Sequence, residues 1–201
     1  KAGQLEITVP PETPASLRES LELGQENPVW SPSGKMIAFT GSGGNGIWAV
    51  QANGGKPVLL CDNSGDSGVA LPAWKGRART LSFSPDGREL AFVNNTPAAT
   101  PSGAEKQASV ESASPDPVIE GINLATGERR VIARSASDGC FSGDGKHFVY
   151  VESDGYGIGI LDTVTGERRM VSATGFSPCP TADNASVVYV DQAGYTRNQL
   201  F

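Results

Sequence analysis

Histidine, cysteine and long apolar runs are scarce in this chain of 201 residues, and each scarcity excludes a class of structure or site. The single histidine is His147, and the three cysteines, Cys61, Cys140 and Cys179, lie far apart, so the sequence contains no zinc-binding cluster. Three cysteines are also too few for a disulfide scaffold. No apolar run approaches the roughly 18 residues that cross a bilayer. Residues 1–5 lack the apolar segment of a signal peptide.

Net positive charge is missing as well. Lysine and arginine total 16 against 22 aspartates and glutamates, which gives a formal net charge of −6. The chain therefore lacks the general positive charge that is typical of a protein that binds nucleic acid or an anionic membrane. Helical apolar periodicity is also absent, apart from a turn or two near Ser16–Leu23. The 25 glycines and 14 prolines are instead typical of short strands joined by tight turns.

The chain repeats a turn of the form (W/F)-S-P-x-G, followed each time by a short apolar strand. Copies lie at Trp30–Gly34, Phe83–Gly87 and Phe141–Gly145, and a decayed copy lies at Pro180–Asn184. In such a turn proline presets the backbone, aspartate or serine bonds the backbone ahead, and glycine takes the positive φ. We expect the aromatic before each turn to pack between repeats. The residues assigned to these structural turns are Pro32, Gly34, Pro85, Asp86, Gly87, Asp144 and Gly145.

Each repeat has a second half, in which an apolar strand leads into an (N/T)-G-(G/E) turn. These turns lie at Asn53–Gly55, Thr126–Glu128 and Thr165–Glu167. A full unit is therefore a meander of four short antiparallel strands. One such sheet cannot bury both faces alone, and stacking copies around an axis solves this in a β-propeller. We predict an all-β propeller of four-stranded antiparallel blades, with about four blades present as a partial ring.

The turn spacings of 53, 58 and 39 residues locate the blades and their insertions. The predicted parts are an N-terminal arm at 1–27 with one strand at Leu5–Val9, blades at 28–71, 72–135, 136–174 and 175–201, and a flexible insertion at 96–117. The last blade stops where its third strand is expected, which predicts a fragment of a longer propeller of six to eight blades. Association of two chains is another way to complete a ring.

These repeats resemble those of the TolB-like propellers, whose blades carry the signature F-S-P-D-G-x-x-(I/L)-A-F. The segment Phe83–Phe92 matches it throughout. The first copy departs at Ser33, the third has Gly143 in place of proline, and the fourth keeps little beyond Asp183. The resemblance covers about residues 28–198.

The resemblance implies a non-enzymatic, protein-binding module of the bacterial cell envelope, periplasmic or secreted, with a protein partner and no cofactor. The alternative that the resemblance implies is the non-catalytic gating propeller of a prolyl oligopeptidase-like serine peptidase whose catalytic domain lies outside this chain. No G-x-S-x-G nucleophile elbow occurs in these 201 residues. A third alternative is a propeller that binds sugar or performs chemistry in its channel, against which the single histidine argues.

Three loops match site motifs only in part. Gly41–Gly46 fits G-x-G-x-x-G, but the strand expected at Ile47–Val50 makes it a hairpin loop rather than a dinucleotide site. Gly65–Gly68 resembles the nucleophile segment of chymotrypsin-like proteases, but the histidine there must precede the serine. Asp62–Gly68 offers the alternating oxygens of a small calcium loop without a downstream acidic ligand. We assign no catalytic, cofactor or metal residue.

Two pairs of arginines, Arg129-Arg130 and Arg168-Arg169, enter the outermost strand of consecutive blades. They form either a basic rim that docks an acidic partner or charged protection of exposed strand edges. We favour edge protection and keep the four arginines as the candidate partner-binding rim. Cys140 and Cys179 occupy matching repeat positions, where two buried free thiols are favoured over a disulfide.

Overall fold

The structure is a computed structural model that describes residues 11–13, 15–42, 46–62, 81–94, 117–152, 157–191 and 196–200. Within these ranges it is all-β apart from one helix, so the predicted fold class is confirmed. The strand expected at Leu5–Val9 and the loop at 63–68 lie outside the described residues, as does the insertion at 96–117 except for Pro117. The blade boundaries stay predictions.

The strands form four antiparallel sheets whose order follows the chain. The helix α1 is Ala15–Leu23. Blade 1 consists of β1 (Gln25–Trp30), β2 (Met36–Gly41), β3 (Ile47–Gln51) and β4 (Val58–Cys61). Blade 2 consists of β5 (Leu81–Phe83), β6 (Glu89–Asn94), β7 (Val118–Asn123) and β8 (Arg129–Arg134). Blade 3 consists of β9 (Ala136–Phe141), β10 (His147–Glu152), β11 (Ile158–Asp162) and β12 (Arg168–Ser172). Blade 4 consists of β13 (Phe176–Pro180), β14 (Ser186–Val190) and β15 (Thr196–Leu200).

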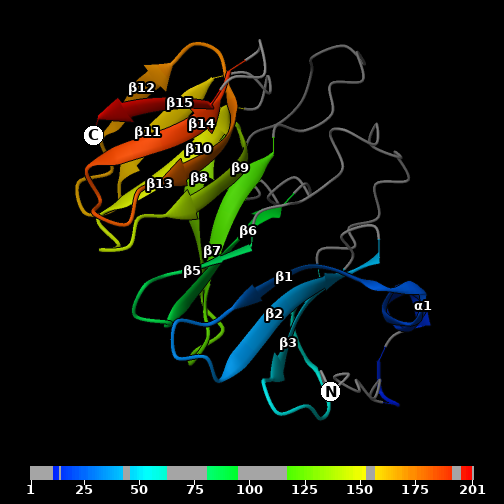
Figure 1. The fold of residues 1–201 in the computed structure, drawn as a ribbon. Helices are drawn as coiled ribbons and strands as arrows, with labels where there is room; N and C mark the ends of the chain where they lie inside the picture. Colours follow the sequence, from blue (N-terminus) through cyan, green and yellow to red (C-terminus); the bar gives the residue numbers. More distant parts are fainter. Residues whose placement is uncertain are drawn as a thin grey trace, which may run out of the picture.

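The four blades follow one another in space as they do in sequence (Figure 1). Their first strands, β1, β5, β9 and β13, contact one another in chain order and therefore form the inner line of the assembly. Later strands of each sheet lie progressively further from this line. This is the arrangement of a partial propeller.

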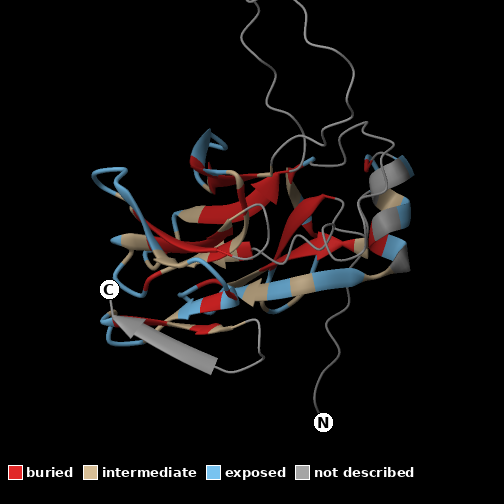
Figure 2. Cartoon of the chain, turned by 90° about the horizontal axis from the view of Figure 1, so that it is seen from above, coloured by how far each residue is buried: buried red, intermediate tan, exposed pale blue. Residues whose placement is uncertain are grey.

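Neighbouring blades pack face to face through apolar side chains. We call the face of a blade toward the preceding blade its leading face and the opposite face its trailing face. Between blades 2 and 3, Ala91 and Val93 of one trailing face meet Phe148 and Tyr150 of the next leading face. Equivalent clusters join blade 1 to blade 2 and blade 3 to blade 4. The second strand of each blade is buried on both faces of its sheet and is therefore a nearly continuous apolar run. Figure 2 shows the buried residues inside the stack of blades.

Among the described residues no blade precedes the leading face of blade 1, and α1 packs on that face. Leu21 is 1% exposed and packs with Phe39, Trp48 and Val50 of this face. The turn or two of helical periodicity near Ser16–Leu23 lies within α1. The expectation that every turn aromatic packs between blades is wrong for Trp30, which is 61% exposed because α1 does not cover it.

We expect Leu21→Ala to lower the free energy of unfolding by about 2–4 kcal/mol, because it removes the buried helix side chain over blade 1. The neighbouring exposed change Glu22→Ala should stay within about 0.5 kcal/mol of wild type. Urea unfolding followed by tryptophan fluorescence measures both. Equal stabilities for the two variants would show that α1 does not hold this face.

Candidate functional site

The four S-P-D-G-type turns share one network built on a hydroxyl group. The hydroxyl of Ser84 accepts the N–H of Glu89 at 3.0 Å and donates to Asp86 Oδ1 at 2.6 Å. Asp86 Oδ1 also accepts the N–H of Arg88 at 3.0 Å. Ser142 with Asp144, and Thr181 with Asp183, repeat these contacts. The hydroxyl and the carboxylate therefore satisfy the backbone donors that the turn leaves free.

In blade 1 an uncharged residue takes the aspartate position. Ser33 Oγ accepts the N–H of Lys35 at 3.4 Å, and Ser31 accepts the N–H of Met36 at 3.1 Å. The turn glycine has a φ of 67° at Gly34, a conformation that glycine adopts without strain. The turn of blade 1 therefore keeps the same backbone geometry although Ser33 departs from the repeat signature.

The turns of successive blades touch through one proline and one glycine. A Cβ on Gly87 would lie 3.7 Å from the ring of Pro32, and one on Gly145 would lie 3.3 Å from the ring of Pro85. Each proline therefore packs over the glycine of the next turn. The result is a continuous row of turns along one face of the stack.

The third contact of this row uses different residues. Gly143 stands where Pro85 stands in blade 2, and Asn184, at a φ of 56°, stands where the turn glycine is expected. Asn184 Oδ1 lies over Gly143 and accepts the N–H of Asp144 at 3.2 Å. The loss of proline and the loss of glycine therefore compensate each other, because the amide fills the space of the missing ring.

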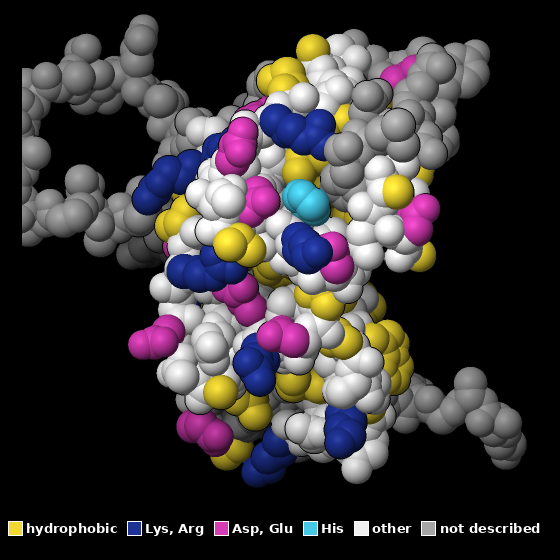
Figure 3. Space-filling view, turned by 90° about the vertical axis from the view of Figure 1, so that its left-hand side faces the viewer, with side chains coloured by type: hydrophobic (Ala, Val, Ile, Leu, Met, Phe, Trp, Pro, Cys, Tyr) yellow, Lys and Arg dark blue, Asp and Glu magenta, His cyan; other side chains and the backbone are white. Residues whose placement is uncertain are grey.

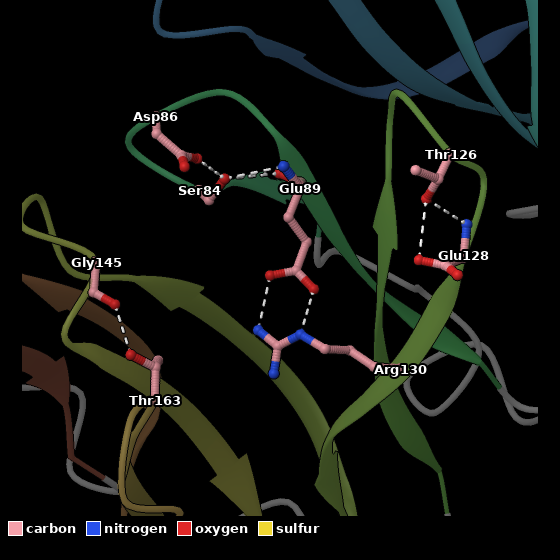
Figure 4. Close-up of polar contacts among 8 residues, drawn as sticks. All are labelled: Ser84, Asp86, Glu89, Thr126, Glu128, Arg130, Gly145 and Thr163. Atoms are coloured by element: carbon pink, nitrogen blue, oxygen red, sulfur yellow. Dashed lines mark hydrogen bonds and ion pairs between the residues drawn. The ribbon is translucent and has the colours of Figure 1, made fainter.

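A groove of about 850 Å³ lies between blades 2 and 3 beside these turns. Its lining includes Glu89 and Arg130 of blade 2 and Asp144, Gly145 and Thr163 of blade 3. Figure 4 shows Arg130 reaching from β8 toward Glu89, with Gly145 and Thr163 on the facing blade. Thr163 Oγ1 donates to the carbonyl of Gly145 at 2.7 Å, which ties the two turns of blade 3 together.

Arg130 and Glu89 form a two-pronged ion pair in this groove. Arg130 Nε and Nη2 donate to the two carboxylate oxygens of Glu89 at 2.6 and 2.7 Å. Gly121, on the strand between them, makes the pair possible, since a Cβ there would lie 2.1 Å from a Glu89 oxygen. Glu89 and Gly121 were not identified from the sequence, because their role depends on the register of three strands.

Arg129 points to the other side of blade 2, toward blade 1. Its Nε donates to Glu120 at 2.9 Å, and its guanidinium lies 5.5 Å from the ring centre of Phe92. Glu120 is buried, so its carboxylate is poorly hydrated, and the ion pair with Arg129 neutralises it there. The arginine pair of blade 2 is thus split between two inter-blade spaces, and each member has a carboxylate.

The arginine pair of blade 3 has the same placement but different partners. Arg168 lies 5.4 Å from the ring centre of Tyr150 and donates to the carbonyl of Arg134 at 3.3 Å. Arg169 is exposed, and among the described residues no ion pair to it is found. His147 occupies the position that Glu89 has in blade 2. Basic and acidic side chains are interspersed on the side shown in Figure 3.

The cysteines are all free thiols, with different exposures. Cys61 is buried and Cys140 half-buried, whereas Cys179 is exposed, so the expectation of two buried thiols is wrong for Cys179. Cys140 Sγ lies 3.6 Å from the Pro178 carbonyl, and burial, followed by the Cys179 sulfur, raises the pKa of Cys140 to about 12. Both side chains point to the trailing side of their blades, so they do not face each other.

Of the remaining candidate loops, residues 63–68 lie outside the described residues. The strand expected after Gly41–Gly46 is β3, so this segment joins two strands of a hairpin. Within the described ranges, no group of three histidine, cysteine, aspartate or glutamate side chains could hold a metal ion. In the same part of the chain no helix is long and apolar enough to cross a membrane.

Comparison with known proteins identifies the architecture. No family model and no curated protein matches the sequence. Solved structures do match: TolB from Acinetobacter baumannii at 21% identity and a TM-score of 0.59, over 87% of this chain and 42% of that one. The chain has the fold of a TolB-like propeller.

Two further matches have the same fold. A putative TolB from Agrobacterium tumefaciens matches at 16% identity and a TM-score of 0.59, over 87% of this chain and 64% of that one. An oligogalacturonate lyase in complex with manganese matches at 15% identity and a TM-score of 0.58, over 88% and 47%. This chain therefore spans between 42% and 64% of these proteins. Because the matches include an enzyme, the fold alone does not decide the activity.

The turn aspartates predict a loss of stability in acid. The hydrogen bond from Ser84, followed by that from the backbone of Arg88, lowers the pKa of Asp86 below 3.8. The Asp86 carboxylate therefore stabilises the folded state above its unfolded-state pKa. This stabilisation is lost as the pH falls through the lower pKa of the folded state. Asp86→Asn should be less stable than wild type at pH 7, and the difference should shrink below about pH 4 in urea titrations. Ser33→Asn, in the turn that has no carboxylate, should show no such pH dependence. A difference for Asp86→Asn that is the same at every pH would contradict this assignment.

The compensated contact between blades 3 and 4 can be tested with a double-mutant cycle. Gly143→Pro should destabilise because the ring meets the Asn184 amide, and Asn184→Gly should destabilise because the Asp144 N–H loses its acceptor. Together they recreate the proline–glycine contact of the other turns, so we expect a favourable coupling of about 0.5–3 kcal/mol in unfolding measurements. Additive effects would show that the two positions are independent.

Proposed function

We propose that this chain is a non-enzymatic, protein-binding propeller module of the bacterial envelope, and that it holds an acidic segment of its partner at the blade 3 rim. The observation that carries the proposal is the difference between two equivalent arginines. Arg130 has a carboxylate from Glu89, whereas Arg169 has His147 at that position and forms no ion pair with a described residue. A carboxylate from outside the chain can therefore bind Arg169 as Glu89 binds Arg130.

The other three arginines of the candidate rim have different roles in this proposal. Arg129 and Arg130 are neutralised within blade 2, where they link strands and protect its edge. Arg168 stacks on Tyr150 and supports the strand that presents Arg169. The proposed binding site is thus narrowed from the four arginines to Arg169, for which no ion pair to a described residue is found, and its neighbour Arg168.

The fold likeness to TolB from Acinetobacter baumannii supports a binding role in the envelope. The turn hydroxyls of this chain are bonded to neighbouring carboxylate groups, and a hydroxyl held in this way structures a turn, whereas a nucleophile needs a base in that place. These contacts argue against chemistry at the turns of the chain itself.

Binding can be tested with the immobilised chain and an extract of bacterial envelope proteins. Wild type should retain a partner whose capture weakens as salt rises, because the contact is electrostatic. Arg169→Glu should reduce that capture at least tenfold, whereas Lys35→Glu, with the same change of charge on the exposed turn of blade 1, should retain it. Equal capture by both variants would overturn the assignment of Arg169.

Enzymatic activity of this chain itself, as distinct from a catalytic domain outside it, needs a separate measurement on the same protein. Labelling with a fluorophosphonate probe of serine hydrolases and assay with oligogalacturonate plus Mn²⁺ should both give no signal above a heat-denatured control. A reproducible signal in either assay would contradict the non-enzymatic role.

A further inference from the structure

We propose that an extended segment of the partner protein adds to blade 3 as a fifth strand, pairing with β12 so that its acidic side chains meet Arg169. This mode of binding rests on the proposed function, which supplies the acidic partner, and it specifies how the segment is held. A segment that adds to the edge of a sheet gains affinity from backbone hydrogen bonds and specificity from alternate side chains. We call the side of a blade's fourth strand that faces away from its sheet the outer edge.

Every second residue of β12 directs its backbone N–H and C=O toward the outer edge. The carbonyl of Glu167 accepts the N–H of Asp162 at 2.9 Å, so Glu167 bonds inward, toward β11. Residues of an antiparallel strand alternate between inward and outward bonding, and the register continues without a shift from Arg168 to Met170. The N–H and C=O of Arg168 and Met170 therefore point outward, where no described strand pairs with β12.

The side chains along this edge are exposed and differ between the two faces of the sheet. Arg168 and Met170, which is 61% exposed, lie on the leading face. Arg169 is exposed on the trailing face, and no ion pair joins it to a described residue. A strand added here places a side chain opposite each of these residues. A segment in which acidic and apolar residues alternate therefore fits, because its carboxylates meet Arg169 while its apolar side chains meet Met170.

The outer edge of blade 2, in β8, is less suited to an acidic segment. Val131 occupies the position of Met170 and is 38% exposed. Arg130 occupies the position of Arg169, but both prongs of its guanidinium already bind the carboxylate of Glu89. An incoming acidic side chain would have to displace that carboxylate, so we expect weaker binding at blade 2.

The outer edge of blade 1, beside β4, has a different composition. Pro57 occupies the position of Arg168 and has no N–H to donate outward. Proline is one of the devices that protect sheet edges from strand addition. Val58 occupies the position of Arg169 and offers no charge to a carboxylate. Among the three outer edges that the structure describes, β12 is therefore the one that combines outward donors with a cation available to a partner.

Fluorescence anisotropy with a short labelled peptide, in which glutamate and valine alternate, tests the proposal. The chain should bind this peptide, and Arg169→Glu should weaken binding at least about tenfold because like charges then lie opposite each other. Lys35→Glu, with the same change of charge on the exposed turn of blade 1, should bind as wild type does. Absence of peptide binding to the wild-type chain would overturn strand addition.

Methylation of alternate backbone amides of the peptide separates strand addition from charge attraction alone. In an added strand every second N–H faces β12, so methylating one alternate set should weaken binding at least about tenfold, and methylating the other set should change it less than about twofold. Equal effects of the two sets would overturn strand addition and leave the acidic contact at Arg169 standing. Equal peptide binding by wild type and Arg169→Glu would overturn that contact, and with it the proposed function.

Two variants of Met170 test the edge from the side of this chain. Met170→Pro removes an outward N–H and no bond to β11, in a place where edge strands accept proline, so the fold should persist while peptide binding falls at least about tenfold. Met170→Val keeps both the N–H and an apolar side chain and should bind as wild type does. Circular dichroism and urea unfolding check that both variants fold. A folded Met170→Pro variant that binds the peptide as tightly as wild type would contradict pairing at this edge.

Discussion

A four-stranded sheet with two apolar faces must be covered on both sides, and the rest of this structure follows from that constraint. Blades 2 and 3 meet it through their neighbours, which bury Phe92, Phe148 and Tyr150 almost completely. Blade 1 meets it on one side through blade 2 and on the other through Leu21 of α1. The hydrophobic effect thus acts mainly between blades, and hydrogen bonds define each sheet.

Polar groups at the ends of the strands keep the blades in register. The hydroxyl–carboxylate turns fix where each second strand begins, and proline–glycine contacts place each turn over the next. Between blades 3 and 4, Gly143 replaces the turn proline and Asn184 replaces the turn glycine. The two turns still contact each other there, through a hydrogen bond from the Asp144 N–H to the Asn184 amide. The same row positions the groove and the arginines, so the candidate site is a consequence of how the blades stack.

The sequence predicts what local residues determine. The turns, the four-strand units and the propeller followed from residues that act within about ten positions of one another, as in Phe83–Phe92. The ion pair of Arg130 with Glu89 joins residues far apart in sequence and needs Gly121 between them, so the sequence could not show it. The exposure of Trp30 was missed for a related reason, since a repeat position does not reveal that its neighbouring blade is absent from the described stack.

Native-state hydrogen exchange is the most direct test of blade stacking as the source of stability. The account predicts that amides of β6 and β10, covered on both faces, exchange most slowly, and that those of β13 and β14, at the open end of the stack, exchange faster through local opening. Equal protection of β10 and β14 would contradict it, because each sheet would then be stable without a neighbour.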